Sequence, residues 1–61
     1  MNTEQAKTWS EVATDNALLR SLIDTFSEAI VCDDADKERL IEVGGIIGDE
    51  ILRRMGGYRN N

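Results

Sequence analysis

The densest group of reactive side chains lies in the stretch "VCDDADKE", residues 31–38, where four carboxylates follow the only cysteine, Cys32. A calcium loop of the EF-hand type needs a twelve-residue ligand pattern with a central glycine and a terminal glutamate, and that pattern is absent. A zinc site is not expected either, because the chain has no histidine and a single thiol. The acids after Cys32 disfavour its thiolate, so we predict a half-buried filler and no metal site.

Catalytic chemistry has no candidate group in this sequence. The serines at positions 10, 21 and 27 fall in one helical segment with no histidine to act as their base. The glycines lack the lysine and the serine or threonine that complete a phosphate-binding loop. The sequence therefore predicts a protein that is not an enzyme, with no catalytic residues and no cofactor.

Two amphipathic segments must position all of these residues. The first is predicted as a helix over about residues 8–31, because apolar side chains recur at spacings of three and four over three heptads. Thr8 and Glu11 match a capping box, although Thr3 can instead cap an additional leading turn. The repeating positions, which we call the seam, are Trp9, Val12, Asn16, Leu19, Ile23, Phe26 and Ile30.

The acidic stretch is predicted to be the turn before a second helix over about residues 35–55. Asp33 or Asp34 can cap this helix, while Arg53 and Arg54 suit the negative end of its dipole. Gly56 suits the left-handed residue that closes a helix, and residues 56–61 are predicted as a polar tail. Because the connection is short, the helices should form an antiparallel αα-hairpin, a single domain over residues 1–61.

The glycines within the second helix are the unusual feature of that segment. Each glycine in a helix interior costs about 1 kcal/mol relative to alanine. Gly44 and Gly48 are four residues apart on the apolar side, where they leave a groove for a large side chain such as Trp9 or Phe26. The alternative is that the pair Gly44 and Gly45 kinks or breaks the helix.

The apolar faces of both helices are wider than one hairpin can cover, and a chain of 61 residues is marginal as an isolated fold. We therefore predict an all-α hairpin that forms a homodimer, a four-helix bundle. In this bundle Asn16 either fixes the register as a buried polar residue or is solvated. The predicted dimer core is Trp9, Val12, Asn16, Leu19, Ile23, Phe26, Ile30, Leu40, Gly44, Ile47, Gly48 and Ile51.

A second, weaker apolar stripe lies beside the seam and is predicted to bind a protein partner. Arginine and large apolar side chains are typical anchors of protein interfaces. The alternative is that Leu18 and Leu22 pack inside the dimer core. The predicted partner-binding residues are Leu18, Leu22, Ile46, Arg39, Arg53 and Arg54.

The net charge and the N-terminal sequence indicate where in the cell the protein lies and which class of partner it binds. Twelve acids and seven bases give a net charge of −5, which disfavours nucleic acid and suits a basic protein partner. The N-terminus lacks a basic region followed by an apolar one, and no apolar run approaches the ~20 residues of a membrane helix. We expect a cytoplasmic protein that does not enter a membrane.

Two helices of this length around "DADKERL", residues 34–40, resemble the Rop family of plasmid proteins that regulate copy number. The resemblance covers most of the chain as a layout and implies an antiparallel four-helix bundle that binds paired RNA loops. The first helix here carries only Lys7 and Arg20 among five acids, so no binding residue is carried over.

We expect a small non-enzymatic modulator that binds and regulates another protein, of a size common among phage- and plasmid-encoded regulators. The alternatives are a Rop-like dimer that binds nucleic acid and, ranked lower, an acidic mimic of nucleic acid.

Overall fold

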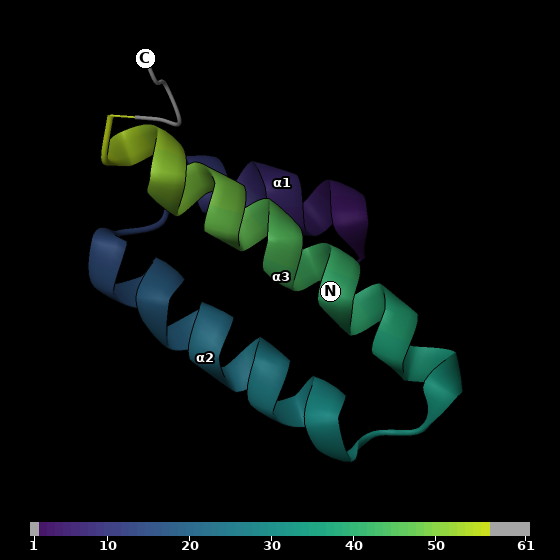
Figure 1. Ribbon diagram of the computed structural model, residues 1–61. Coiled ribbons are helices and arrows are strands. Elements are labelled where there is room, and N and C mark those ends of the chain that lie inside the picture. Colours follow the sequence, from purple (N-terminus) through teal and green to yellow (C-terminus); the bar gives the residue numbers. More distant parts are fainter. Residues whose placement is uncertain (1, 57–61) are drawn as a thin grey trace.

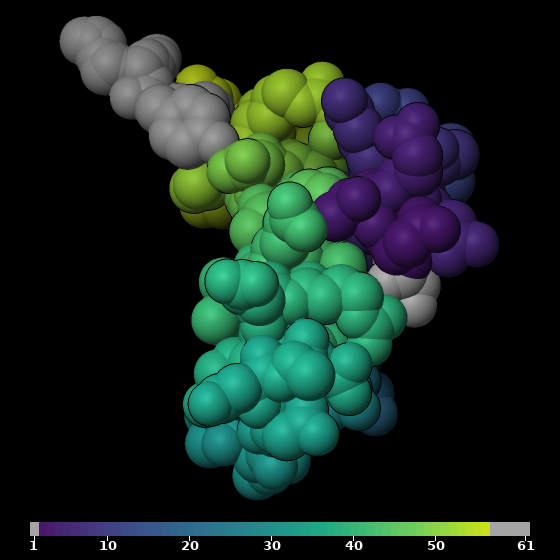
Figure 2. All heavy atoms as spheres, turned by 90° about the vertical axis from the view of Figure 1, so that its right-hand side faces the viewer, coloured from purple at the N-terminus to yellow at the C-terminus, as the bar shows by residue number. Residues whose placement is uncertain are grey.

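The computed structural model describes residues 2–56, and these residues form three helices without a strand. Helix α1 spans Thr3–Val12, α2 spans Asp15–Val31 and α3 spans Asp34–Arg54. Helices α2 and α3 run antiparallel as a hairpin, and α1 lies against the C-terminal half of α3 (Figure 1). In Figure 2 the α1 residues gather at that end of the molecule, and the α2–α3 turn extends away from them. The all-helical class predicted from the sequence is thus confirmed.

The first helix begins earlier than residue 8. Asn2 is the N-cap of α1: its side chain accepts the backbone N–H of Gln5 at 2.8 Å. The Gln5 side chain in turn accepts the N–H of Asn2 at 3.0 Å, which completes a capping box. The prediction that Thr8 and Glu11 form the cap is wrong, because both lie inside α1. Thr3 is the first helical residue rather than the cap.

A break at Ala13 and Thr14 divides the segment that the periodicity predicts as one helix, so the prediction of an unbroken helix over residues 8–31 is wrong. Both residues are extended, with φ/ψ of −74°/153° at Ala13 and −72°/161° at Thr14. The Thr14 hydroxyl accepts the N–H of Ala17 at 3.2 Å and starts α2. Threonine is a good N-cap residue, and hydrophobic periodicity does not register the cap.

Helix α3 corresponds to the second predicted helix and runs unbroken through its glycines. Asp33 caps it by accepting the N–H of Asp36 at 3.2 Å, as the sequence predicts. The helix continues across Gly44 and Gly45, so the alternative of a break at this pair is wrong. Gly56 has a φ of 104° and follows the C-cap, which confirms its predicted role. The rest of the predicted tail, residues 57–61, lies outside the described residues.

The core lies where α3 meets the other two helices. Its buried members come from all three helices: Ala6, Leu18, Val43 and Ile47. Partly buried side chains pack around them: Trp9, Ala13, Leu22, Ile46 and Ile51. A core this small buries few large side chains, and that leaves several others outside. Within residues 2–56, no helix combines the length and apolarity needed to cross a bilayer.

Candidate functional site

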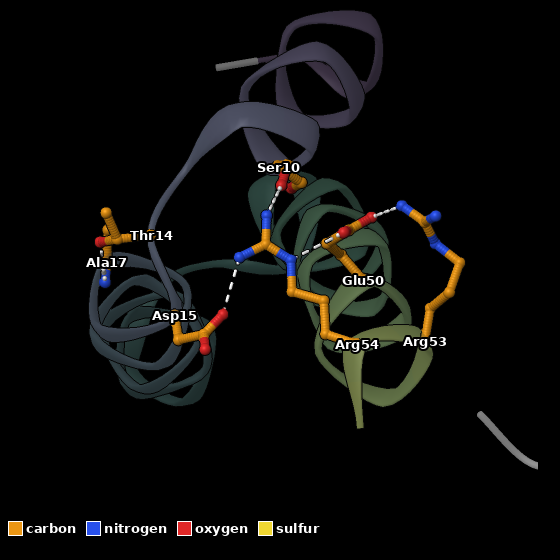
Figure 3. Close-up of polar contacts among 7 residues, drawn as sticks. All are labelled: Ser10, Thr14, Asp15, Ala17, Glu50, Arg53 and Arg54. Carbon is orange, nitrogen blue, oxygen red and sulfur yellow. Dashed lines mark hydrogen bonds and ion pairs between the residues drawn. The ribbon is translucent and has the colours of Figure 1, made fainter. Parts of the chain in front are cut away.

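A cluster of charged side chains joins the three helices at the C-terminal end of α3 (Figure 3). We call it the Arg54 cluster: Ser10, Asp15, Glu50, Arg53 and Arg54. The Arg54 guanidinium donates three hydrogen bonds, from Nε to Glu50 Oε2 at 2.8 Å, from Nη1 to Asp15 Oδ1 at 2.8 Å and from Nη2 to the Ser10 carbonyl oxygen at 3.0 Å. Arg53 Nη2 donates to the other oxygen of Glu50.

Each contact in this cluster follows from where the helices end. Arg54 is the last residue of α3, Ser10 lies in the last turn of α1, and Asp15 is the first residue of α2. The Ser10 carbonyl is one of the C-terminal oxygens that a helix leaves without an internal partner. A cation is favourable at that helix end, and an acid such as Asp15 is favourable at a helix start. One guanidinium therefore satisfies the end of α1 and the start of α2 together.

The electrostatics of the cluster keep both partners ionised. Hydrogen bonds from Arg54 and then from Arg53 lower the pKa of Glu50 below its ordinary value, and these outweigh the opposing effect of burial. The hydrogen bonds with Glu50 and Asp15 raise the pKa of Arg54. The Glu50 side chain is only 10% exposed and that of Arg54 27%, so this pair is better shielded from solvent than a surface ion pair. A carboxylate stabilised in this way is poorly suited to exchange protons, and we interpret the cluster as a clamp.

A second feature lies on the side of the hairpin that α1 does not cover. We call it the apolar face: seven large side chains that are 40–77% exposed, from Leu19, Ile23, Phe26, Ile30, Ile41, Leu52 and Met55. None of these seven side chains is charged; Asp15 and Arg54 border the face beside Leu19 and Met55.

The register of the hairpin explains why these residues share one side. A Cβ added at Gly44 would lie 2.7 Å from Phe26 Cζ, and one added at Gly48 would lie 3.9 Å from Leu22 Cδ1. Phe26 and Leu22 are therefore opposite these glycines, and the predicted close approach of Phe26 is confirmed. In an antiparallel pair of helices, one row of residues on each helix faces the other helix. The residues beside that row, on the same side of both helices, form one surface. At 3.6 residues per turn, this places Leu19, Ile23 and Ile30 beside Ile41 and Leu52.

The residues predicted as a dimer core divide into two groups. Ile47 and Gly44 are buried within the protomer, and Trp9, Leu40, Gly48 and Ile51 are half-buried there. The other six are exposed: Val12, Asn16, Leu19, Ile23, Phe26 and Ile30. Of these six, the four from Leu19 to Ile30 lie on the apolar face, and the assembly that would cover them stays a prediction.

The residues predicted to bind a partner are mostly used inside the protomer. Leu18 is fully buried, so the prediction that it lies on a binding surface is wrong. Leu22 and Ile46 are half-buried against the core, and Arg54 is held in the clamp. The physical reason is that α2 presents Leu18 and Leu22 to α3, in the place predicted for the seam. Arg39 and Arg53 remain at the surface, where they pair with Asp36 and Glu50.

Asp15 and Glu50 belong to the Arg54 cluster but are not among the site residues predicted from the sequence. The spacing of four between Glu50 and Arg54 could have indicated their ion pair, since such pairs face each other on a helix. The contact of Arg54 with Asp15 spans 39 positions and follows only from the bend between α1 and α2.

No group within residues 2–56 has the arrangement of a metal site. One hollow between α1 and α3 is lined by charges of both signs from Lys7, Glu11, Glu50 and Arg53. Cys32 is half-buried at the end of α2, with Sγ 3.7 Å from the Ala29 carbonyl oxygen, which suits a small filler.

Comparison with protein-family models, with curated proteins and with solved structures finds no match to this chain. The resemblance to the Rop family therefore stays a prediction from the sequence.

Proposed function

We propose that this chain is a non-enzymatic regulatory protein that acts by binding another protein, and that it does so as a homodimer. The observation that carries the proposal is the apolar face. Monomeric soluble proteins rarely leave a contiguous apolar patch of this kind uncovered, and such patches commonly mark interaction sites. A second copy of the chain is the occupant we assign to it.

Three features support a second copy on the apolar face. The buried core of the protomer has one leucine, one isoleucine and one valine as its only large apolar members in the described residues, which is little for an isolated fold. The seven side chains of the face are uncharged, so they can pack against a second copy without bringing charges of that acidic chain into their contact. Two antiparallel hairpins that share such a face form a four-helix bundle with a symmetric interface.

The regulated partner protein would contact the outer surface of this dimer. Arg39 and Arg53 are the predicted partner-binding residues that stay accessible, with side chains 49% and 67% exposed. Their positions on α3 point away from the apolar face at 3.6 residues per turn, so dimerisation leaves them free to make contacts.

The arginines weigh against binding of nucleic acid through phosphates. Each arginine in residues 2–56 pairs with a carboxylate: Arg20 with Asp24, Arg39 with Asp36, Arg53 with Glu50, and Arg54 with Glu50 and Asp15. A phosphate would have to compete with these acids, and an acidic chain repels it. This arrangement favours a protein partner over the Rop-like alternative.

Two adjacent substitutions test the role of the apolar face. Ile30 and Val31 are 77% and 81% exposed, and both lie in the last turn of α2, but only Ile30 belongs to the face. We expect Ile30→Asp to give a folded monomer in size-exclusion chromatography with light scattering. Val31→Asp, the matched control, should keep the dimer. Equal behaviour of the two variants would contradict the proposal.

A further inference from the structure

The bend between α1 and α2 is not imposed by the residues that form it. Neither Ala13 nor Thr14 is a proline or a glycine, the residues that usually break a helix. Alanine is the strongest helix former, and both residues can adopt helical backbone angles. The bent form is therefore stabilised by the Thr14 cap of α2 together with contacts elsewhere in the protomer.

The hydrogen bonds around the bend identify those contacts (Figure 3). In a continuous helix the Ser10 carbonyl would accept the N–H of Thr14, four residues on. In the bent form Arg54 donates to this carbonyl instead, at 3.0 Å. The N–H of Ala17, which would otherwise bond to the Ala13 carbonyl, is accepted by the Thr14 hydroxyl at 3.2 Å. Arg54 and Thr14 thus supply partners for two of the backbone groups that lose their helical bonds at the bend.

The apolar pattern passes through the bend without a change of phase. The seam residues Val12, Asn16 and Leu19 keep the spacing of four and three on either side of it. In the bent protomer this stripe is divided: Val12 is 79% exposed, and Trp9 packs against the core with α3. The sequence therefore retains the pattern of one long helix that passes through the bend.

Helix α1 also buries one polar group that has no hydrogen-bond partner. Ser10 is 2% exposed, and its hydroxyl is the side-chain polar atom in residues 2–56 that is buried without a hydrogen-bond partner. A buried polar group without a partner destabilises the arrangement that encloses it. This lowers the cost of moving α1 away from its own α3.

We propose that α1 is an exchangeable arm: α1 and α2 straighten into one helix when a second copy joins, and α1 then packs on α3 of that copy. Exchange of an identical element conserves its contacts, here the packing of Ala6 into the buried core, and is a low-cost route to a dimer. Straightening restores the helical bonds across Thr14. Arg54 is the latch that holds the bent form. The inference rests on the homodimer of the proposed function.

Two substitutions at Thr14 should shift the equilibrium between the bent and the straight form in opposite directions. Proline suits the φ of −72° at Thr14, and the extended Ala13 before it is also compatible, so Thr14→Pro keeps the bent form. In a continuous helix the same proline would be strongly destabilising. Thr14→Ala removes the cap of α2 and favours the continuous helix. We expect sedimentation equilibrium to give a dimer about a hundredfold weaker for Thr14→Pro and about tenfold tighter for Thr14→Ala.

Hydrogen exchange of the unmodified chain supplies an independent readout. In the bent form the amides of Asp15 and Asn16 open α2 and have no acceptor within that helix. In the straightened form both bond to carbonyls of α1, so their protection should rise with chain concentration as the dimer forms.

The outcomes distinguish a failure of the exchangeable arm from a failure of the proposed dimer. If wild type and Thr14→Pro dimerise equally and Asp15 stays unprotected in the dimer, the arm is disproved and the dimer stands. If wild type stays monomeric at millimolar concentration, the proposed dimer fails, and the arm fails with it.

Discussion

Substitution of the three glycines in α3 by alanine tests the register of the hairpin. At Gly45 a Cβ would meet nothing within 4 Å, so Gly45→Ala should stabilise the fold by about 1 kcal/mol through helix propensity. Gly48→Ala should do the same, because its Cβ would make an ordinary contact with Leu22 at 3.9 Å. At Gly44 the Cβ would lie 2.7 Å from Phe26 Cζ, and the ring must move.

The effect of Gly44→Ala on the free energy of unfolding is the difference between a packing cost and a gain in helix propensity. Overpacking a contact costs about 1–3 kcal/mol, and the alanine gains about 1 kcal/mol of helix propensity. The net effect of Gly44→Ala should therefore range from neutral to a loss of about 2 kcal/mol. For a chain of this size, a difference of 1 kcal/mol shifts the melting temperature by about 4–8 °C.

The assay is urea unfolding followed by circular dichroism at one fixed chain concentration. Gly45→Ala and Gly48→Ala should raise the midpoint, and Gly44→Ala should leave it unchanged or lower it. In a Phe26→Leu background the clash is relieved, so Gly44→Ala should then stabilise. If Gly44→Ala raises the wild-type midpoint as much as Gly45→Ala does, the packing of Phe26 on Gly44 is refuted.

Three further substitutions probe the clamp and a helix cap. Arg54→Gln should lower the urea midpoint more than Arg53→Gln, because Arg54 bonds all three helices and Arg53 bonds Glu50 alone; equal losses would rule out the clamp. The lowered pKa of Glu50 means that its contribution is present above its ordinary value of 4.5 and is lost as the pH falls through the folded-state pKa. Glu50→Gln should thus flatten the acid side of a stability–pH profile, and a profile that is unchanged would argue against this. Asp33→Ala removes the cap of α3 and should cost about 1 kcal/mol in chemical unfolding, whereas Asp34→Ala beside it should cost less.

The parts of the fold that depend on local signals could be predicted from the sequence. The cap at Asp33, the end of α3 at Gly56 and the approach of Phe26 to Gly44 each follow from residue type and spacing of neighbours. The bend at Ala13 and Thr14 could not be predicted in this way. Hydrophobic periodicity does not register the Thr14 cap, and the contacts of Arg54 that accompany the bend reach Asp15 and Ser10 across 39 and 44 positions.

The same limit explains the assignment of the two apolar stripes on α2. Periodicity identifies both stripes but does not say which one meets α3 and which one faces outward. Leu18 and Leu22 meet α3, and Ile23 and Ile30 are left outside. The stripe predicted as a seam therefore becomes the apolar face, and the stripe predicted as a partner surface becomes the core.

The central claim is that a second copy covers the apolar face, and isotope-filtered NMR tests it most directly. A mixture of labelled and unlabelled chains at millimolar concentration reports only contacts between copies. The account predicts intermolecular NOEs from the methyl groups of Ile23, Ile30 and Ile41, and none from the buried Leu18. A sample with no intermolecular NOEs from these isoleucines, or with NOEs confined to other residues, would contradict the claim.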